Sequence, residues 1–488
     1  TIFIFALGIV IMGLSFSGKG RNMKSFFAAG GAVPWPMSGL SLFMGFFSAG
    51  TFVVWGSIAY SLGWIAISIQ WTMAIAGFVV GFFIAPRWHK TSALTVAEYI
   101  TRRLGVNTQK TYTYLFLFIS LFTTGSFLYP VAKIVEVSTG MPLDLCILLL
   151  GGFCILYVAA GGLWAVVSTD VLQFIILTAA VLIVVPLSFG RVGGVVNFIE
   201  SIPVTYFNLV NGEYTIGFII AFGVYNAIFL GGNWAYVQRY ASVNSQSSAR
   251  KVGFLFGGLY VVSAVLWMLP PMIYRIVNPS LSAIEAEGAY LMMCKEVLPA
   301  GLLGLMLSGM IFATASSLNA TLNISSGVVT NDIFKRLFPQ SSDKTLMRVA
   351  RISTIVFGLL AIIVALLIPL MGGIVNVVIS VAALTGVPLY LPIIWTLFSK
   401  RQTEYSVITT TLVSLGANAF FKFITPLWGF GFNRAEEMIV GVAFPVLCLI
   451  AFELYYKLNH KISYRYVEYQ EWEKENNCIK AVSYTHLT

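Results

Sequence analysis

Long apolar runs recur along almost the whole chain, and they constrain the fold more than any other feature. A helix needs about 20 apolar residues to cross a hydrocarbon core about 30 Å thick. We therefore predict an all-α integral membrane protein with about thirteen transmembrane helices. The runs lie near residues 1–16, 35–60, 64–86, 111–135, 142–160, 165–190, 213–238, 252–276, 297–326, 348–370, 373–398, 405–424 and 437–457.

Composition and charge agree with this class and predict an orientation. With 58% hydrophobic and 10% charged residues, the chain is too apolar for a water-soluble globular protein. If each run crosses once and residue 1 lies outside the cell, 23 of the 29 Lys and Arg residues fall on the cytoplasmic side. We expect a multi-pass protein of the cell membrane with its first residues extracellular and its C-terminus cytoplasmic. The net charge of +10 then reflects topology, and no nucleic-acid partner is predicted.

The two ends of the chain differ in sequence from the predicted spans between them. The first run follows neither a Met nor a positively charged segment, so we expect a truncated start and not a signal peptide. Residues 482–488, VSYTHLT, are expected to be a sequencing artefact.

The five Cys and three His residues have no metal-ligand spacing and form no nucleophile–base pair, so we predict a protein that is not an enzyme.

Two glycine-interrupted runs, 35–60 and 213–238, occupy corresponding places in the two halves of the chain. Such pairs mark the broken helices of transporters built from inverted repeats, because freed backbone carbonyls survive in a bilayer only where they line a cavity or hold a ligand. The alternative is that small residues only let helices pack closely. Each run opens a block of five predicted spans. The expected divisions are 1–34 (peripheral helix and loop), 35–190 (first repeat), 191–212 (extracellular connection), 213–398 (second repeat), 399–458 (two peripheral helices) and 459–488 (cytoplasmic tail).

The stretch IFATASSLNATLNISSGVVTNDIFKR, residues 311–336, carries many hydroxyl and amide groups within a predicted membrane helix. Ala313, Ser316 and Ser317 stand at i, i+3 and i+4, so one carbonyl and two hydroxyls share a face. Hard neutral oxygens suit a small hard cation such as sodium. Alternatively, these hydroxyls bond back to the carbonyl four residues earlier and only bend or pack the helix.

Several segments resemble the sodium/solute symporter family. The run SSLNATLNISSGVVTNDIF looks like one family signature, and GMPLDLCILLLGGFCILYVAAGGLWA, from Gly140 to Ala165, looks like the other. SLFMGFFSAGTF, residues 41–52, and YVQRY, residues 236–240, fit as well. The resemblance implies a leucine-transporter-type fold, with two inverted five-helix repeats and peripheral helices. It also implies solute import driven by Na⁺.

The resemblance assigns a sodium site to the first broken helix and to the helix around residue 315. The ligands would be the carbonyls of Met44, Phe47 and Ala313 and the hydroxyls of Ser316 and Ser317. Thr321, Asn323, Ser325 and Ser326 would bond across helices or face the cytoplasmic vestibule. A second cation site would use Asp170 and Asn319, but members with two sodium ions carry hydroxyls where this chain has Asn319 and Ala320. We therefore expect one sodium ion, with Asp170 alternatively serving the dipole of its helix N-terminus.

Substrate contacts implied by the resemblance come from the broken helices and the second core helix. They are Ser48, Thr51, Gln70, Asn226 and Phe229, with Phe47 and Phe229 as aromatic lids. Neutral amides suit hydroxyl-rich ligands because each both donates and accepts hydrogen bonds. Thr51, Tyr260 and Ile379 depart from the sugar-binding pattern, and Thr123 replaces an Arg that binds a carboxylated sugar. Gln70 and Asn226 could instead hydrogen-bond between helices.

Together these observations predict a sodium-driven symporter of a small polar organic solute, with a sugar or sugar derivative favoured. A monocarboxylate, an amino acid, a vitamin or a proton-coupled carrier of the same fold are the alternatives. The predicted partners are the solute, the sodium ion and the lipid bilayer, and the sequence fixes no oligomeric state. About thirty residues follow the last run, too few for a signalling domain.

Overall fold

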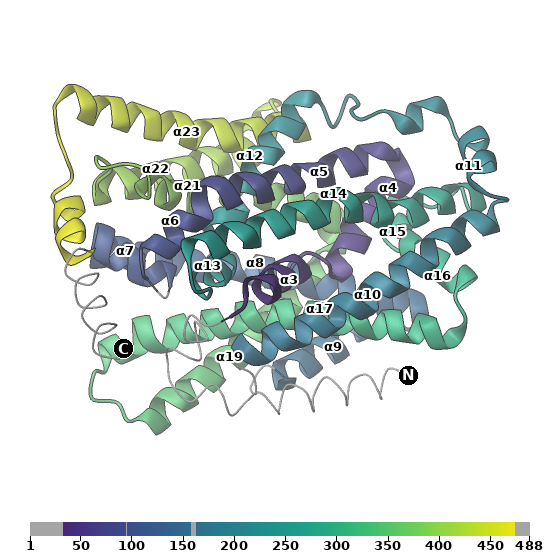
Figure 1. Cartoon of the computed structure of the whole chain (residues 1–488), viewed down its shortest axis with the longest axis horizontal. Coiled ribbons are helices and arrows are strands. Elements are labelled where there is room, and N and C mark those ends of the chain that lie inside the picture. The colour runs from purple at the N-terminus through teal and green to yellow at the C-terminus, as the bar shows by residue number, and fades with distance from the viewer. Residues whose placement is uncertain (1–32, 94, 158–162, 474–488) are drawn as a thin grey trace.

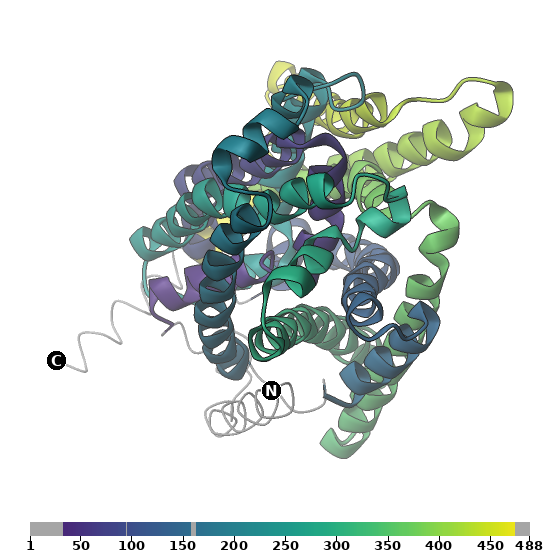
Figure 2. The same ribbon diagram turned by 90° about the vertical axis from the view of Figure 1, so that its right-hand side faces the viewer.

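The computed structural model describes residues 33–93, 95–157 and 163–473, and within these ranges it contains helices and no strands. The helices run side by side along the long axis of the molecule, as Figure 1 shows, and Figure 2 views the bundle end-on. Helices α7 and α13 lie at one end, and α11, α15 and α16 lie at the other. The predicted span at residues 1–16 and the tail at 482–488 lie outside the described residues.

In the described part of the chain, the first five-span block and the connection after it contain nine α-helices before the second broken span. Pro34 precedes α3 and has no N–H to leave unpaired at a helix start. The elements are α3 (Trp35–Met44), η2 (Thr51–Trp55), α4 (Gly56–Leu62), α5 (Trp64–Val79), η3 (Val80–Ile84), α6 (Ala85–Lys90), α7 (Val96–Leu104), α8 (Val106–Thr139), α9 (Leu143–Tyr157), α10 (Leu163–Arg191), α11 (Val195–Ser201) and η5 (Val204–Phe207).

The second block repeats the order of a broken span followed by four further spans, and two peripheral helices follow it. Its elements are α12 (Ile216–Gly232), α13 (Trp234–Ala241), α14 (Gln246–Val277), α15 (Ala283–Ala286), α16 (Ala289–Val297), α17 (Ala300–Gly327), η6 (Val328–Phe334), α18 (Lys335–Leu337), α19 (Asp343–Leu367), η7 (Pro369–Met371), α20 (Ile374–Val381), η8 (Ala382–Gly386) and α21 (Val387–Thr396). The peripheral elements are α22 (Glu404–Ala419), η9 (Phe420–Ile424), η10 (Thr425–Trp428) and α23 (Arg434–Leu458), and a helix at 464–473 ends the described chain.

In the described part of the chain, eight helices are long and apolar enough to span a membrane. The pair α12 and α13, which is bent by 60° at its break, makes a ninth if the two helices are counted as one span. Shorter apolar helices at Thr51–Leu62, Leu143–Gly152 and Ala300–Thr314 coincide with three more of the predicted runs. The multi-span all-helical class is therefore confirmed, while the count of thirteen stays a prediction.

Helices α8 and α14 extend well beyond the apolar runs that predicted them. They contain 34 and 32 residues, although the runs cover 111–135 and 252–276. At 1.5 Å per residue, a helix of this length exceeds a hydrocarbon core of about 30 Å. Hydropathy marks only the part of a helix that lipid surrounds, so the polar end turns were missed.

The two blocks are interleaved and do not form separate units. Helix α5 of the first block packs on α12 and α14 of the second, and α3 packs on α14 and α10. Helices α22 and α23 pack on each other at the edge of the bundle, where both views place them outside the central helices. Functional residues from both blocks can therefore meet at the centre of the bundle.

Candidate functional site

The first broken helix is interrupted within residues 35–60, where the glycine pattern predicted a break. Helix α3 ends at Met44, the next four residues form turns and bends, and helical structure resumes at Ala49. The Ala49 N–H donates to the hydroxyl oxygen of Thr314 on α17, with 3.1 Å between nitrogen and oxygen. Thr314 in turn donates to the Met310 carbonyl at 2.9 Å. This contact joins the broken helix of the first block directly to α17 of the second.

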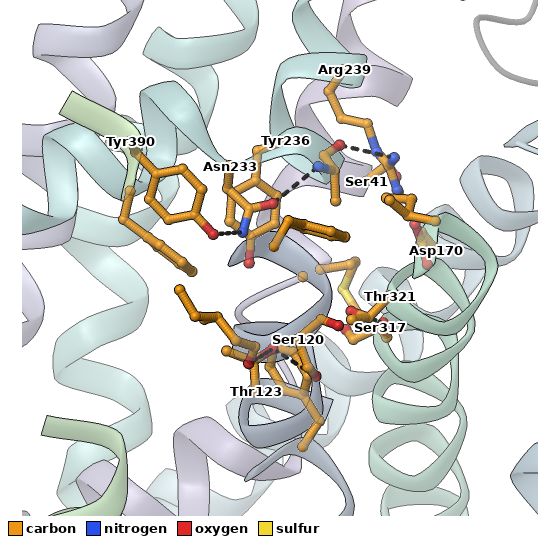
Figure 3. A pocket seen from close by; sticks show the side chains of 18 of the residues that line it. Ser41, Ser120, Thr123, Asp170, Asn233, Tyr236, Arg239, Ser317, Thr321 and Tyr390 are labelled. Atoms are coloured by element: carbon orange, nitrogen blue, oxygen red, sulfur yellow. Dashed lines mark hydrogen bonds between the residues drawn. The ribbon is translucent and has the colours of Figure 1, made fainter. Parts of the chain in front are cut away.

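A pocket lies between α3, α8, α10, α13 and α17, and we call it the α3–α17 pocket (Figure 3). Three of the five predicted sodium ligands line it, namely Met44, Ala313 and Ser317. The other lining residues are Ser41, Gly45, Phe116, Ile119, Ser120, Thr123, Phe127, Asp170, Phe229, Asn233, Ala235, Tyr236, Arg239, Thr321, Ile324 and Tyr390. The side chains of the predicted ligands Ser316 and Asn319 lie outside the described residues, although both positions belong to α17.

The hydroxyls of the α17 stretch divide into two groups. Ser317 donates weakly to the Ala313 carbonyl, with 3.4 Å between the oxygens, and Thr321 donates to the Ser317 carbonyl at 3.1 Å. These are the bonds within the helix that the alternative interpretation expected. Ser325 instead donates to Ser120 on α8 at 3.1 Å, and Ser326 donates to a carbonyl of α19 at 2.7 Å. The prediction of bonds across helices is therefore confirmed for Ser325 and Ser326. Thr321 instead bonds within α17, and the side chain of Asn323 lies outside the described residues.

Asp170 lies beside the predicted sodium residues at one corner of this pocket. Its carboxylate accepts a 2.6 Å hydrogen bond from Ser41 on α3, and the Ser41 oxygen accepts another from Arg239 Nε on α13 at 3.2 Å. Figure 3 shows the three side chains gathered together, with Ser317 and Thr321 along α17 nearby. Asp170 is the eighth residue of α10 and therefore lies beyond the first turn, where a helix dipole acts most strongly. The alternative role at a helix N-terminus is therefore wrong.

Phe47 contributes its ring to an aromatic cluster. The ring is stacked on Trp267 with centroids 4.7 Å apart, and it also contacts the rings of Phe43 and Phe52. Phe47 lines neither the α3–α17 pocket nor the central cavity described next. The position of the Phe47 ring therefore does not support the predicted role as an aromatic lid over the solute. The predicted role of the Phe47 carbonyl as a sodium ligand does not depend on the ring.

A second and larger cavity lies at the centre of the bundle, and we call it the central cavity. All five predicted substrate residues line it, namely Ser48, Thr51, Gln70, Asn226 and Phe229. Its volume is about 170 Å³, against about 80 Å³ for the α3–α17 pocket. One water needs roughly 10–15 Å³ by this measure, so the central cavity has room for a solute of several heavy atoms.

The polar groups in the central cavity differ in how well they are paired. Asn226 donates to the hydroxyl of Thr72 at 2.8 Å, and the Thr51 hydroxyl donates to the Phe46 carbonyl. The Nε2 group of Gln70 is buried and has no hydrogen-bond partner. Because an unpaired buried amide costs about 1–3 kcal/mol, the Gln70 donor is a natural contact for a ligand oxygen. The interhelical alternative therefore holds for Asn226 and not for this donor.

No side chain with a full charge lines the central cavity among the described residues. The wall is largely aromatic and aliphatic, with a few hydroxyls and two carboxamides. Thr123 and Tyr260, which depart from the family's sugar and sugar-acid patterns, both line it. Ile379 is buried in α20 and does not line it. A charged solute would have to leave water without a side chain of opposite charge to pair with.

The two hollows share part of their walls. The unwound residue Gly45 lines both, and so do six side chains, namely Ile119, Thr123, Phe127, Phe229, Tyr236 and Tyr390.

Thr314, Arg239 and Tyr390 were not predicted as site residues. Thr314 and Arg239, the Arg within YVQRY, are polar residues in apolar surroundings, so the sequence could have singled them out. Tyr390 stands in an apolar run without a distinguishing pattern.

Comparisons with known proteins place this geometry in a family. The model of the sodium:solute symporter family matches residues 26–413. The sodium/glucose cotransporter of Vibrio parahaemolyticus is 29% identical over 87% of this chain and 85% of its own length. Sodium/myo-inositol cotransporter 2 of Sus scrofa is 27% identical over 84% of this chain and 68% of its own length. These relatives are transporters and not enzymes.

Solved structures agree on the architecture. A substrate-bound, outward-open Na⁺-coupled sialic acid symporter superposes with a TM-score of 0.78 at 21% identity, over 93% of this chain and 96% of that one. A nucleobase-cation-symport-1 family transporter in a closed conformation superposes with a TM-score of 0.56 at 13% identity, over 92% and 99%. These likenesses show the fold, and they confirm the expected leucine-transporter-type architecture. Because the family model covers most of the sequence, this chain belongs to the sodium:solute symporter family.

Proposed function

We propose that this protein imports a small, uncharged polar solute, with a sugar or sugar derivative favoured, and drives the import with one sodium ion by alternating access. The observation that carries the proposal is the shared wall of the two hollows. The unwound segment after Met44 borders the pocket that holds Ala313 and Ser317, and it continues into Ser48 and Thr51 of the central cavity. An ion bound on one side of this segment can therefore alter the solute site on the other side.

The oxygens assigned to sodium suit a cation that must be released in every cycle. Hard cations bind oxygens at about 2.3–2.6 Å, so neighbouring ligands on one ion lie about 3–4 Å apart. The Ser317 hydroxyl and the Ala313 carbonyl, 3.4 Å apart, meet this requirement. The carbonyls of Met44 and Phe47 would complete the site from the broken helix, together with the Ser316 hydroxyl. All five ligands are neutral, which favours binding weak enough for release.

A single sodium ion is supported by the partners of Asp170. Its carboxylate accepts a hydrogen bond from Ser41, and it also stabilises the nearby Arg239 guanidinium. A carboxylate engaged in this way is less available to a second cation. We therefore assign Asp170 to the contact between α3, α10 and α13, and the second cation site with Asn319 stays the less favoured alternative.

The central cavity sets the class of solute. Its lack of charged side chains among the described residues disfavours carboxylates and amines, because their burial without a partner is costly. The unpaired Gln70 Nε2 group and the Ser48 and Thr51 hydroxyls offer donors and acceptors to a hydroxylated molecule. The aromatic wall would pack against the apolar faces of the solute. Relatives named for glucose and myo-inositol support the same class.

Alternating access requires that sodium bind one conformation more tightly than the other. The proposed site draws ligands from α3 and from α17, so it is complete only while the two elements are in contact. Opening on the cytoplasmic side would separate them, which weakens sodium binding and releases the solute. Sodium binding would therefore raise the affinity for the solute. By thermodynamic linkage, solute binding must then raise the affinity for sodium by the same factor.

Uptake into proteoliposomes tests the proposal. Purified protein is assayed with radiolabelled D-glucose and myo-inositol, with an inward sodium gradient or with choline in its place, at fixed pH. Sodium-dependent uptake of at least one solute is expected, and D-glucuronate, which adds a carboxylate, should compete poorly. Uptake driven equally well by a proton gradient without sodium would overturn sodium coupling. Uptake of carboxylates or amino acids alone would overturn the assignment of an uncharged solute.

The same proposal includes the membrane orientation. We place α7, the 464–473 helix and the C-terminus on the cytoplasmic side, and α11, α15 and α16 outside, which follows from the distribution of Lys and Arg. We also assign 35–190 and 213–398 to the two inverted repeats and 399–458 to peripheral helices. Cysteines introduced at Asn211 and at Lys461 in intact cells should react with an impermeant thiol reagent only at Asn211, and the reverse pattern would refute the orientation.

A further inference from the structure

A short π-helical segment interrupts one of the helices that form the central cavity. This segment, η8 (Ala382–Gly386), lies between α20 and α21, and we call it the η8 bulge. Five residues at and beside it line the cavity, namely Val378, Val381, Ala382, Thr385 and Gly386. A π-helical turn changes the hydrogen-bond register from i+4 to i+5, which disturbs the regular pairing of backbone carbonyls. In a membrane protein such carbonyls need partners from neighbouring helices.

The opposite side of the η8 bulge is held by α22. Asn418 is buried there, and its Nδ2 group donates to the Ala383 carbonyl at 3.1 Å and to the Leu384 carbonyl at 3.2 Å. Both donor hydrogens of this amide are thus directed at two consecutive carbonyls of the bulge. Asn418 does not line the central cavity, so it cannot contact a solute directly.

Helix α23 supports the same carbonyl from another direction. A Cβ atom built on Gly441 would lie 2.3 Å from the Ala383 carbonyl oxygen, so only glycine permits this approach. On the cavity side, a Cβ atom on Gly386 would lie 2.2 Å from the Tyr225 ring. The η8 bulge is therefore fixed between the two peripheral helices on one side and a cavity-lining tyrosine on the other. A shift of the bulge would move the wall of the solute site.

We propose that Asn418 is a positioning residue for the central cavity, which acts through the η8 bulge and sets how Val381, Ala382 and Thr385 face the solute. Helices α22 and α23 lie outside the two repeats, and this contact gives them a role in solute recognition. The part that concerns the solute rests on the proposed function. The part that concerns the cavity wall does not, and it can be tested without any solute.

A thiol reporter tests the wall directly. Thr385→Cys is introduced into full-length protein whose five native cysteines are replaced by serine, and its rate of reaction with a small methanethiosulfonate is measured in proteoliposomes. Asn418→Leu keeps the side-chain volume and removes both donors. We expect it to raise the rate by roughly threefold or more, because carbonyls without a protein partner recruit water from the cavity. Gly441→Ala acts on the same carbonyl from α23 and should raise the rate as well.

Thr410→Val is the matched control. Thr410 lies two turns earlier on the same buried face of α22, and its hydroxyl oxygen has no hydrogen-bond partner. An unchanged rate in Thr410→Val, with increases in Asn418→Leu and Gly441→Ala, would support the proposal. An unchanged rate in Asn418→Leu would overturn it. An equal increase in Thr410→Val would also overturn it, because that pattern reports a general loosening of α22. The thermal unfolding temperature of each variant identifies proteins that have lost their fold. If Asn418→Leu is one of them, the reaction rate of Gly441→Ala tests the proposal in its place.

Uptake kinetics separate positioning from stability. With D-glucose and myo-inositol as probes, Asn418→Leu should raise the apparent KM for the solute by roughly threefold or more, while half-saturation by sodium stays within about twofold. Asn418→Gln, which keeps the amide, should recover part of the loss. A fall in maximal rate with KM unchanged would contradict the proposal. If the wild type takes up neither probe, that result counts against the proposed function, and the thiol measurement still decides the role of Asn418.

Discussion

The backbone N–H of Ala49 donates a 3.1 Å hydrogen bond to the hydroxyl of Thr314, which lies 265 residues further along the chain. Ala49 is the first residue of the helix that resumes after the break, and Thr314 lies between the predicted sodium ligands Ala313 and Ser316. The bond closes the gap between the unwound segment and α17. It therefore holds in contact the two elements whose separation is proposed to release sodium.

Thr314→Val should weaken this contact with little change in shape. Valine keeps the volume but leaves the buried Ala49 N–H without a partner, which costs about 1–3 kcal/mol. We expect a lower thermal unfolding temperature and a higher sodium concentration at half-maximal uptake. Thr314→Ser, which keeps the hydroxyl, should restore both. Ser308→Ala, which removes a buried hydroxyl bonded only within α17, is the control for general effects on this helix.

Ser317→Ala should change sodium dependence more than it changes the amount of folded protein. It removes one proposed ligand, and the hydrogen bond that is lost with it is long, at 3.4 Å. We expect the sodium concentration at half-maximal uptake to rise about tenfold, which corresponds to about 1.4 kcal/mol. Thr330→Val, which removes a hydroxyl bonded back to Ser326 beyond the pocket, should leave the sodium response intact. A sodium titration identical to that of the wild type would exclude Ser317 as a ligand.

Arg239 and Asp170 should be energetically coupled, although Ser41 stands between them. Arg239→Gln leaves the Asp170 carboxylate without its nearby cation in a buried place, and we expect a loss of about 3 kcal/mol in stability. Adding Asp170→Asn removes the remaining charge. The double variant should therefore lose less than the sum of the single variants, by about 1 kcal/mol. Thermal unfolding of all four proteins completes the cycle, and strictly additive losses would refute the coupling.

Glu287 provides a prediction about pH at the proposed extracellular end. It lies between α15 and α16, and its carboxylate accepts hydrogen bonds from the Tyr129 hydroxyl at 2.8 Å and from the Ile374 N–H at the start of α20 at 3.0 Å. Burial raises the pKa of this carboxyl above its ordinary value of 4.5, although the two hydrogen bonds and Lys133 oppose the shift. The folded protein therefore binds this proton more tightly than the unfolded chain does.

The stabilising effect of Glu287 is full below pH 4.5 and is lost as the pH rises through the raised pKa. Glu287→Gln cannot titrate and keeps an oxygen for the Ile374 N–H. We expect the unfolding temperature of the wild type, relative to this variant, to be highest near pH 4 and to decline as the pH is raised. Glu200→Gln, at an exposed carboxyl of α11 at the same end of the molecule, serves as the control. A difference that grows with pH would show that the pKa of Glu287 is lowered in the folded protein.

Hydropathy alone predicted the class of fold, because a bilayer imposes the same length and apolarity on every span. The glycines of residues 35–60 and 213–238 predicted where helices break, because unwound backbone inside a membrane needs small residues and polar partners. The five residues expected to contact solute came from a resemblance, and the structure places all of them on one cavity. For the spans and the breaks, the information lies in local chemistry that can be read along the chain.

The contacts between the repeats were decided only by the tertiary structure. Nothing local distinguishes Thr314 from its neighbouring hydroxyls, and only the approach of Ala49 from the other repeat selects it. The same holds for Arg239 beside Asp170 and for Asn418 at the η8 bulge, because each acts on a group more than thirty residues away. Sequence determined which residues are polar inside the membrane, and packing determined which of these groups are paired and which are left to face a ligand.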